Sequence, residues 1–278
     1  MAPIRIRPMR PADVVPAAEM MRRGDWGDRS AFLDWAVGHP SCHPLVAEED
    51  RRVVGTGTAT AYGAVGWVGT IFVETESRGR GFGRALTRAV VADLEASGCR
   101  TLLLIATDRG RPLYEGEGFS VQTEHLRLAA AGAEIGGVDP AVQPFRPEML
   151  PAIVALDRDV NGGDRGNVLR ALATPEGTQV AIGRDGSLRG FLLRGPWGGG
   201  ALIAPDPDDA VRLLDWRRRR AGPDGRVATG LPGLNVAGRD RLLAEGWIEE
   251  PGATRMIRGE PLDWRPEAVW GQLSGSLG

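Results

Sequence analysis

The sequence predicts an α/β protein with two successive domains, and three observations lead to this prediction. Apolar, β-prone runs alternate with stretches whose apolar residues recur at helical spacing. A glycine-rich turn joins one such strand to a helix at residues 73–83. After a low-complexity stretch at 129–137 the pattern of the first half begins again, and 278 residues are enough for two domains.

The first half of the chain alternates strands and helices in a defined order. Residues 4–7 alternate in polarity as a strand does, and Asp13 lies near the start of the helix that follows. The expected helices are 12–23, 30–37, one that begins at the glycine turn and a short one that carries Tyr114; the expected strands are 44–48, 52–62, 67–73, 101–105 and a last one that ends near 128. The predicted order is β-α-α-β-β-β-α-β-α-β.

The second half repeats this organisation more loosely. A linker is expected at 129–141, because alanine and glycine dominate its first nine residues. The elements expected beyond it are a helix that ends near 158, strands at 178–182, 188–193, 201–204 and near 227, and helices at 208–220 and 234–245. Gly246-Trp247 follows the last helix, as Gly118-Phe119 follows the helix with Tyr114. The predicted domains are therefore 1–128 and 142–278.

The composition excludes several classes of protein. Hydrophobic residues make up 42% and charged residues 25%, as in ordinary soluble globular proteins. No apolar run approaches the length of about 20 residues that spans a bilayer, and the first residues lack the hydrophobic centre of a signal peptide. Two cysteines make no disulfide framework, which favours a reducing cytoplasm. A formal net charge of -2 argues against general affinity for nucleic acid.

Metal and lysine chemistry are not expected either. Two cysteines and three scattered histidines lack the spacing of a zinc site. Cys42 and His43 are neighbours on an extended segment and therefore point to opposite faces, so they form no catalytic pair. All 34 basic residues are arginine, so no lysine can act as a base or form a Schiff base.

The glycine-rich turn has the properties of an anion site. Gly79, Gly81 and Gly83 carry no side chains that would keep a ligand away from the backbone, and the first N–H groups of the helix are free to donate. The spacing does not fit a dinucleotide fingerprint, because Arg84 or Leu86 stands at the place of the last glycine. A phosphate loop of the Gly-Lys-Ser/Thr type is excluded because the chain has no lysine.

The turn resembles the R/Q-x-x-G-x-G/A signature of the GNAT acetyltransferases, with Arg78, Gly81 and Gly83 at the defined positions. The short helix with Tyr114, which ends in Gly118-Phe119, resembles a second landmark of that family. The resemblance implies that the turn holds the pyrophosphate of acetyl-CoA. The implied acetyl-CoA contacts are Ile71, Phe72 and Val73 on the strand and Arg78, Gly79, Arg80, Gly81, Phe82, Gly83 and Arg84 in the turn. The alternative is a purely structural turn in an unrelated α/β domain.

The second half resembles the degenerate domain of bacterial tandem GNAT proteins, on the evidence of residues 156–165 and 254–256. The resemblance implies an α/β (α+β) chain of two GNAT-like domains, each a mixed, mostly antiparallel sheet flanked by helices. Residues 205–209 are acidic and lack the glycine signature, so the second domain is expected to bind no CoA. The cluster Asp157, Asp164 and Arg165 is interpreted as an ion-paired helix start, and 217–220 as a solvated helix end.

Acyl transfer from a thioester requires a neutral amine, a polarised carbonyl and a proton for the leaving thiolate. The resemblance gives Tyr114 the role of general acid; the alternative is an ordinary core tyrosine. A direct carboxylate base is in doubt, because Trp67 stands where some family members carry a glutamate. Glu74 and Glu76 flank the turn and are expected to be solvated.

The residues proposed for the acceptor site are Asp25, Trp26, Tyr62 and Trp67. Asp25 and Trp26 lie in the connection between the first two helices, where a carboxylate and an indole could receive a cationic amine. The alternative is a solvated loop in which Trp26 covers the core.

The resulting hypothesis is an acetyl-CoA-dependent N-acetyltransferase that acts on the primary amine of a small molecule by direct attack, with no metal. Two alternatives remain open. One is a non-catalytic acyl-CoA-binding module whose second domain docks a partner. The other is an acetyltransferase that acts on lysines of a partner protein.

Overall fold

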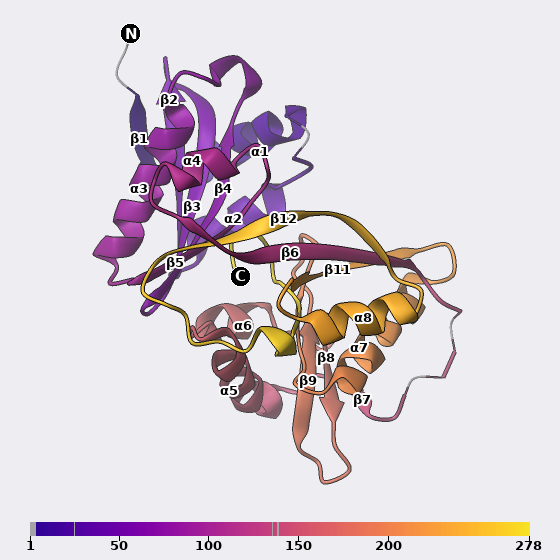
Figure 1. Cartoon of the computed structure of the whole chain (residues 1–278). Coiled ribbons are helices and arrows are strands. Elements are labelled where there is room, and N and C mark those ends of the chain that lie inside the picture. Colours follow the sequence, from indigo (N-terminus) through magenta and orange to yellow (C-terminus); the bar gives the residue numbers. More distant parts are fainter. Residues whose placement is uncertain (1–3, 25, 135, 138) are drawn as a thin grey trace. The chain divides into compact units, whose positions relative to one another are not determined.

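The computed structural model describes residues 4–24, 26–134, 136–137 and 139–278. The chain forms two compact units, each built from more than one stretch of sequence (Figure 1). Unit 1 comprises Met1–Ser120, Met256–Pro261 and Gly275–Gly278; unit 2 comprises Val121–Arg255 and Leu262–Ser274. Within the described part of the chain, no helix is both long and apolar enough to span a bilayer.

Unit 1 is a mixed sheet with helices on both faces. Its elements are β1 (Arg5–Pro8), α1 (Val14–Arg23), α2 (Ser30–Gly38), β2 (Cys42–Glu49), β3 (Arg52–Tyr62), β4 (Val65–Val73), α3 (Phe82–Ala96), β5 (Thr101–Ala106), α4 (Arg111–Glu115) and the end of β12 (Ile248–Gly259). The strand order is β1-β2-β3-β4-β5-β12. The first four strands are antiparallel neighbours, and β4 and β5 are parallel.

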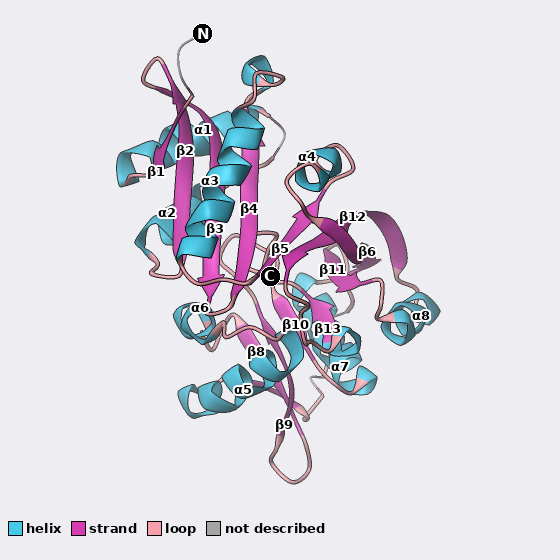
Figure 2. Ribbon diagram, turned by 60° about the vertical axis from the view of Figure 1, so that its left-hand side comes forward, coloured by secondary structure: helices cyan, strands magenta, loops and turns pink. Residues whose placement is uncertain are grey.

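Two glycines of β3 let α3 lie directly on one face of the sheet. A Cβ atom at Gly55 would stand 2.9 Å from Leu86 Cδ1, and one at Gly57 would stand 3.0 Å from Val90 Cγ2. Side chains at these positions would therefore push the helix away. The residues of β3 that alternate with the glycines face α1 on the other side, where the Thr56 hydroxyl lies 3.8 Å from Met21 Sδ (Figure 2).

The strands β4 and β5 pair over three residues only. Val65–Trp67 are in register with Thr101–Leu103, after which β4 continues to Val73 with no register to β5 among the described residues. The pairing of β4 with β3 is interrupted between Thr56 and Thr58, opposite Thr70, whose φ of 47° is unusual for a β-branched residue. Beyond Trp67 this edge of β4 therefore has no strand partner among the described residues.

The described residues of unit 2 form a second sheet and four α-helices. Its elements are β6 (Ser120–Ala131, shared at its first residue with unit 1), β7 (Val142–Pro144), α5 (Leu150–Asn161), α6 (Gly166–Leu172), β8 (Thr178–Ile182), β9 (Leu188–Leu193), β10 (Ala201–Ile203), α7 (Pro207–Ala221), β11 (Arg226–Pro232), α8 (Val236–Ala244), the first part of β12, and β13 (Val269–Gly271). Five strands form an antiparallel sheet in the order β13-β10-β9-β8-β7, and β6 pairs with β11. The fully buried Trp270 lies in its core.

The predicted α/β class, with mixed sheets flanked by helices, is confirmed. The division of the chain differs from the predicted boundaries 1–128, 129–141 and 142–278. Ala129–Ala131 continue β6 and pair with Arg226–Ala228 of β11, because small apolar side chains fit this buried strand as well as they fit a linker. Met256–Pro261 and Gly275–Gly278 belong to unit 1.

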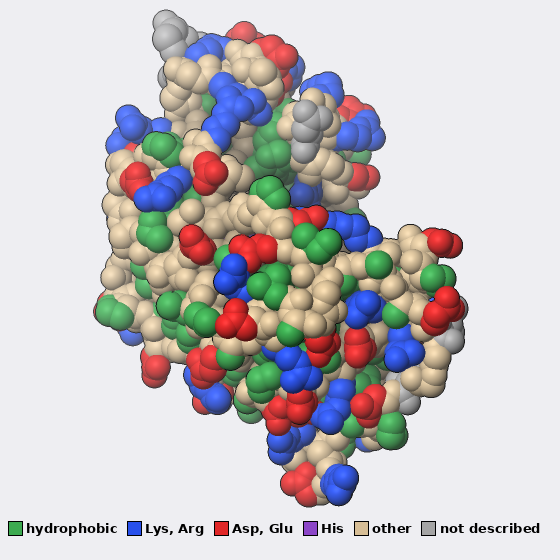
Figure 3. Space-filling model, turned by 45° about the vertical axis from the view of Figure 1, so that its right-hand side comes forward, with side chains coloured by type: hydrophobic (Ala, Val, Ile, Leu, Met, Phe, Trp, Pro, Cys, Tyr) green, Lys and Arg blue, Asp and Glu red, His purple; other side chains and the backbone are tan. Residues whose placement is uncertain are grey.

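The charged surface consists of closely mixed signs. On the face drawn in Figure 3, acidic and basic side chains lie next to one another. Ion pairs such as Arg111–Glu115 at 2.7 Å and Arg239–Glu249 at 2.7 Å join exposed side chains. The run at 217–220 is not solvated throughout as expected: Arg218 and Arg219 donate to the carbonyl oxygens of Ala131 and Glu134. Burial also lowers the pKa of Arg217 to about 10.

A buried ion pair ties α5 to the start of α6. The Arg165 guanidinium donates from Nε to Asp157 Oδ2 at 3.0 Å and from Nη2 to Asp157 Oδ1 at 2.5 Å. The side chain of Asp157 is 1% exposed and that of Arg165 is 3% exposed. Asn161 adds a hydrogen bond to Asp157 Oδ1 at 3.1 Å. The expected ion-paired helix start is confirmed: Asp157 pairs with Arg165, and Asp164, which also accepts from the backbone N–H of Gly166, lies 3.8 Å from Arg158.

We expect Asp157→Asn to lower the free energy of unfolding by about 3 to 5 kcal/mol, because it leaves a buried guanidinium without its charge partner. The matched control is Asp159→Asn on the same helix. Asp159 pairs with Arg265 at 2.9 Å but is 61% exposed, so its loss should cost less than about 1 kcal/mol. Urea unfolding of the full chain measures both values, and equal losses would contradict the assignment.

Candidate active site

The glycine turn of unit 1 is exposed and opens α3. Gly81 is the residue before the helix and has φ of 90°, and Gly79 has φ of 74°. The backbone N–H of Ala85 is the first to donate into the helix, to Gly81 O at 3.0 Å, so the N–H groups before it remain available to a ligand. A Cβ atom at Gly79 would meet no atom within 4 Å, so open space lies over the turn. These features fit a diphosphate.

The arginines of the turn are held in place by carboxylates and carbonyls. Arg78 donates from Nε to Val73 O at 2.9 Å, and its guanidinium carbon lies 5.7 Å from the centre of the Phe72 ring. Arg80 forms a two-point ion pair with Glu49, which lowers the pKa of Glu49. An incoming phosphate would share Arg80 with that carboxylate.

Arg84 lies further along the same helix end and is 58% exposed. Its Nε is 3.2 Å from Glu117 Oε1, and Arg88 donates to the other oxygen of the same carboxylate at 2.8 Å. Two guanidinium groups therefore share one carboxylate. A net positive charge remains beside the turn, as an anion site requires.

The three predicted strand contacts lie on the open part of β4. Ile71 and Val73 pack against the core on the α3 side. Phe72 faces α1 and α2, where a Cβ atom at Gly24 would stand 2.3 Å from Phe72 Cζ. Backbone groups of successive residues point alternately to β3 and to the strand edge that has no β5 partner among the described residues, and the Val73 carbonyl already accepts from Arg78.

Tyr114 lies on α4 and belongs to the core of unit 1. Its side chain is 8% exposed and makes an edge-to-face contact with Phe119 at 6.1 Å between ring centres. Burial raises the pKa of Tyr114 to about 12, so the hydroxyl is protonated at neutral pH and can only donate or share its proton. No hydrogen-bond partner for this hydroxyl is found among the described residues.

Glu74 is not solvated, in contrast to the expectation from the sequence. It is 6% exposed and accepts from Arg52 Nη1 at 2.6 Å and Nη2 at 2.5 Å, and from Ser77 Oγ at 3.0 Å. The short helix at Thr75–Ser77 folds back over this carboxylate and brings its partners to it. Glu76 is exposed, as expected. Glu74 therefore closes the turn and is not available as a free base.

The residues proposed for the acceptor site are found in two places. Trp26 is half-buried and packs on Phe72, with ring centres 5.3 Å apart. Tyr62 and Trp67 are 3% and 4% exposed and contact the segment Gly275–Gly278. Asp25 lies outside the described residues.

Threonine hydroxyls form a further polar group on the α1 and α2 face that sequence reasoning missed. The Thr56 hydroxyl donates to Thr70 O at 2.9 Å, and the hydroxyls of Thr58 and Thr70 share a hydrogen bond. The alternation Gly-Thr-Gly-Thr-Ala-Thr in β3 could have revealed this face, since every second residue of a strand points the same way.

Neither cysteine has the properties of a nucleophile. Burial raises the pKa of Cys42 to about 12 and also raises that of Cys99. His43 Nδ1 lies 2.6 Å from Asp93 Oδ2 and makes no pair with the adjacent Cys42. Over the described residues, no group of three or more His, Cys, Asp and Glu side chains could hold a metal ion.

The helix of unit 2 that would correspond to α3 is α7, and acidic residues cap its N-terminus. The Asp206 carboxylate accepts from the backbone N–H of Asp208 at 2.9 Å at the start of α7. Asp209, one turn into the helix, is paired with Arg212 at 2.8 Å. Carboxylates thus occupy the place that a phosphate would take.

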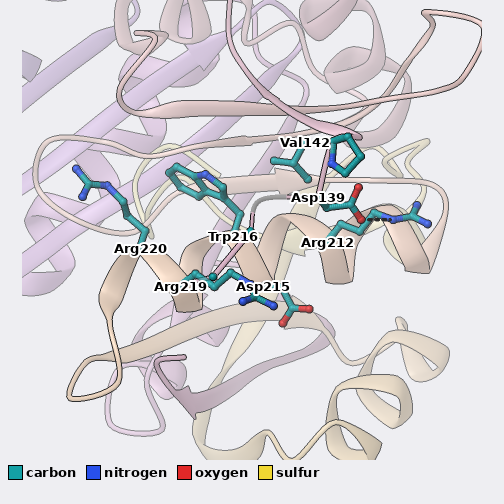
Figure 4. Close-up of a pocket in the computed structure, with 10 residues that line it drawn as sticks. Asp139, Val142, Arg212, Asp215, Trp216, Arg219 and Arg220 are labelled. Carbon is teal, nitrogen blue, oxygen red and sulfur yellow. Dashed lines mark ion pairs between the residues drawn. The ribbon is translucent and has the colours of Figure 1, made fainter. Parts of the chain in front are cut away.

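Unit 2 also contains a cavity of about 580 Å³ beside α7 (Figure 4). Trp216 lies on its wall, and Arg212 and Asp139, which also line it, form an ion pair at 3.2 Å. Burial raises the pKa of Asp215, which also lines it. The cavity has the volume of a small-molecule site, but its charges largely balance within the wall and it lacks the glycine turn.

The raised pKa of Tyr114 can be measured directly. The chain has two tyrosines, so in Tyr62→Phe the tyrosinate absorbance reports Tyr114 alone. We expect half-ionisation near pH 12 in the folded chain and near pH 10 after unfolding. The stability that depends on this group is complete below about pH 10 and is lost as the pH rises through about 12, because the unfolded chain releases its proton first. A folded-state value near 10 would mean that the phenol is hydrated.

Residues 14–119 match the sequence profile of the acetyltransferase (GNAT) family. No sequence among the curated proteins matches the chain.

Solved structures match nearly the whole chain. One is a proposed acetyltransferase from Pyrococcus horikoshii, with 20% identity, a TM-score of 0.84, and 100% of this chain and 97% of that chain covered. A tandem GNAT protein from the clavulanic acid biosynthesis pathway has 13% identity and a TM-score of 0.62, with 94% and 100% covered. A GCN5-related N-acetyltransferase from Sphaerobacter thermophilus has 14% identity and a TM-score of 0.61, with 94% and 97% covered. At these identities the likeness is one of fold, and the match to the GNAT acetyltransferase family is confined to residues 14–119.

Proposed function

We propose that the protein is an acetyl-CoA-dependent N-acetyltransferase that acetylates the primary amine of a small molecule by direct attack. One observation carries the proposal: the exposed glycine turn opens α3 at the end of a strand whose edge is unpaired. The turn supplies N–H donors for a diphosphate, and the strand edge supplies amide groups for an extended chain.

The proposed binding of acetyl-CoA uses two parts of unit 1. Free N–H groups at the start of α3 and the guanidinium groups of Arg80 and Arg84 would hold the diphosphate. The backbone of Ile71–Val73 would pair with the amides of the pantetheine arm, as an added strand pairs with a sheet edge. Because β5 leaves β4 after Trp67, there is an edge for this pairing.

In the proposed reaction the amine nitrogen attacks the thioester carbonyl, a C–N bond forms and the C–S bond breaks. The nitrogen loses one proton and the departing sulfur gains one, so the reaction is balanced without a further reactant. The Tyr114 hydroxyl would donate to the departing sulfur. Its pKa of about 12 exceeds the value of about 8.5 for a thiol, so hydrogen bonding is favoured over complete transfer of its proton.

A carboxylate base on β4 is not part of the proposal. The nine residues of β4 include no acidic residue, and Glu74 at its end is bound by Arg52. The amine would therefore react in its neutral form and release its proton to water, so the rate should rise with pH towards the pKa of the amine, about 10.

The proposed function is tested by calorimetry with acetyl-CoA followed by a thiol-release assay over a panel of small amines. Binding together with amine-dependent release of thiol is the expected result. Tight binding without thiol release over the whole panel would favour a non-catalytic acyl-CoA-binding module. Release only in the presence of a lysine-containing protein would point to a protein substrate.

We expect Gly81→Ala to weaken acetyl-CoA binding at least tenfold, because a Cβ atom at φ of 90° strains the turn that would hold the diphosphate. Gly98→Ala is the matched control, since Gly98 ends the same helix with φ of 87° and open space around it. Both variants should lose about 1 to 2 kcal/mol of stability. Calorimetry measures the affinity for acetyl-CoA, and equal affinities in the two variants would show that the turn does not bind it.

Tyr114→Phe should lower kcat by about 10²-fold or more while leaving the dissociation constant of acetyl-CoA within twofold, because only the proton donor is removed. The phenyl ring retains the packing on Phe119, so the melting temperature should change little. Steady-state kinetics with a saturating amine provide the measurement. Unchanged kcat between pH 7 and 9 would show that Tyr114 is a core residue only.

A further inference from the structure

The segment Gly275–Gly278 belongs to unit 1 and packs on the face of β4 opposite α3, to which Trp67 and Gly69 point. A Cβ atom at Gly69 would stand 2.2 Å from Ser276 Oγ and 2.4 Å from Ser276 Cα, so the segment occupies the place of a side chain at that position. A Cβ atom at Gly278 would stand 2.5 Å from Trp67 Cε2. Ser276 and Leu277 are 4% and 0% exposed.

A tyrosine holds the backbone of this segment. The Tyr62 hydroxyl, at the end of β3, donates to Leu277 O at 3.1 Å. The phenol is itself buried, so little water competes for the bond. The segment is thus fixed at three neighbouring points, by Gly69, Trp67 and Tyr62.

The location of these points relates the segment to the proposed chemistry. Trp67 is the last residue of β4 in register with β5, and Gly69 is the second residue beyond it. The segment therefore covers the face of β4 where its edge becomes free. A thioester bound along that edge would have Ser276 and Leu277 on the side from which α1 and α2 approach the sheet.

We propose that Gly275–Gly278 forms a wall of the acceptor site and determines the size of the amine that reaches the thioester; this inference rests on the proposed function. Tyr62 is a positioning residue that acts through Leu277. The side chains that the structure places beside the segment and Gly69 include the hydroxyls of Tyr62 and Thr58, which carry no charge. Thr58 is in register with Gly69 and shares a hydrogen bond with Thr70.

This proposal also gives Gly69 a specific function. Gly69 is not among the described glycines with positive φ, so its backbone conformation does not require a glycine. A glycine is required because Ser276 approaches closely, and any side chain at position 69 would displace the segment. A larger residue at 69 would therefore open the wall without touching the glycine turn or Tyr114.

The test compares Gly69→Ala, Tyr62→Phe and the control Gly38→Ala in the full chain. Gly38 ends α2, and a Cβ atom there would meet nothing within 4 Å. The measurement is kcat/KM for unbranched and bulky primary amines, together with KM for acetyl-CoA. We expect Gly69→Ala to change the ratio of bulky to unbranched amine at least tenfold and Tyr62→Phe to change it about threefold. The control and the KM for acetyl-CoA should stay within twofold.

Unchanged selectivity in both folded variants would overturn the proposal. A change in the KM for acetyl-CoA equal to that for the amine would also overturn it, because it would indicate a general loss of structure. Should Gly69→Ala fail to fold, Tyr62→Phe still decides, since it keeps the ring and removes only the hydrogen bond to Leu277. Failure of the wild-type chain to acetylate any amine would instead refute the proposed function, and this inference with it.

Discussion

The separation of β4 from β5 is the constraint on which the site depends. Three residues of parallel pairing hold the strands together, and beyond Trp67 the edge of β4 lacks that neighbour. An unpaired strand edge inside a domain exposes backbone groups that need partners. In unit 1 this edge leads directly into the glycine turn and α3, so an extended ligand with an anionic end could satisfy strand and helix together.

Close packing maintains this arrangement. The glycines of β3 bring α3 down onto the sheet, and Glu74 draws Arg52 and Ser77 together at the end of β4. The turn between β4 and α3 is thus held by a buried carboxylate rather than left flexible. Such support by the surrounding residues is what allows a site to keep its geometry before a ligand binds.

Much of the fold could be predicted from the sequence because local signals determine it. The strands 178–182 and 188–193 agree with β8 and β9, and the stripe of apolar residues after Gly83 forms the buried side of α3. The glycine turn was also predictable, since it consists of consecutive residues. Glu74 was not, because its burial depends on Arg52, twenty-two residues earlier.

The proposed acceptor site shows more clearly which contacts cannot be predicted from short stretches of sequence. Tyr62 and Trp67 were selected as substrate residues from their positions on strands, yet both contact a segment more than two hundred residues further along the chain. No periodicity or motif in Gly275–Gly278 indicates where it packs. Long-range contacts of this kind are decided by the shape of the whole unit, which short windows of sequence do not contain.

The discontinuous composition of unit 1 has a consequence for biosynthesis. Its sheet includes the end of β12, and one face of β4 is covered by residues 275–278, so the ribosome must synthesise the chain as far as these residues before this unit can close. Unit 2 is translated in the interval. A nascent chain that lacks residues 275–278 would expose Gly69 and Trp67 to water. Chaperones that recognise apolar surface could bind the chain at these residues.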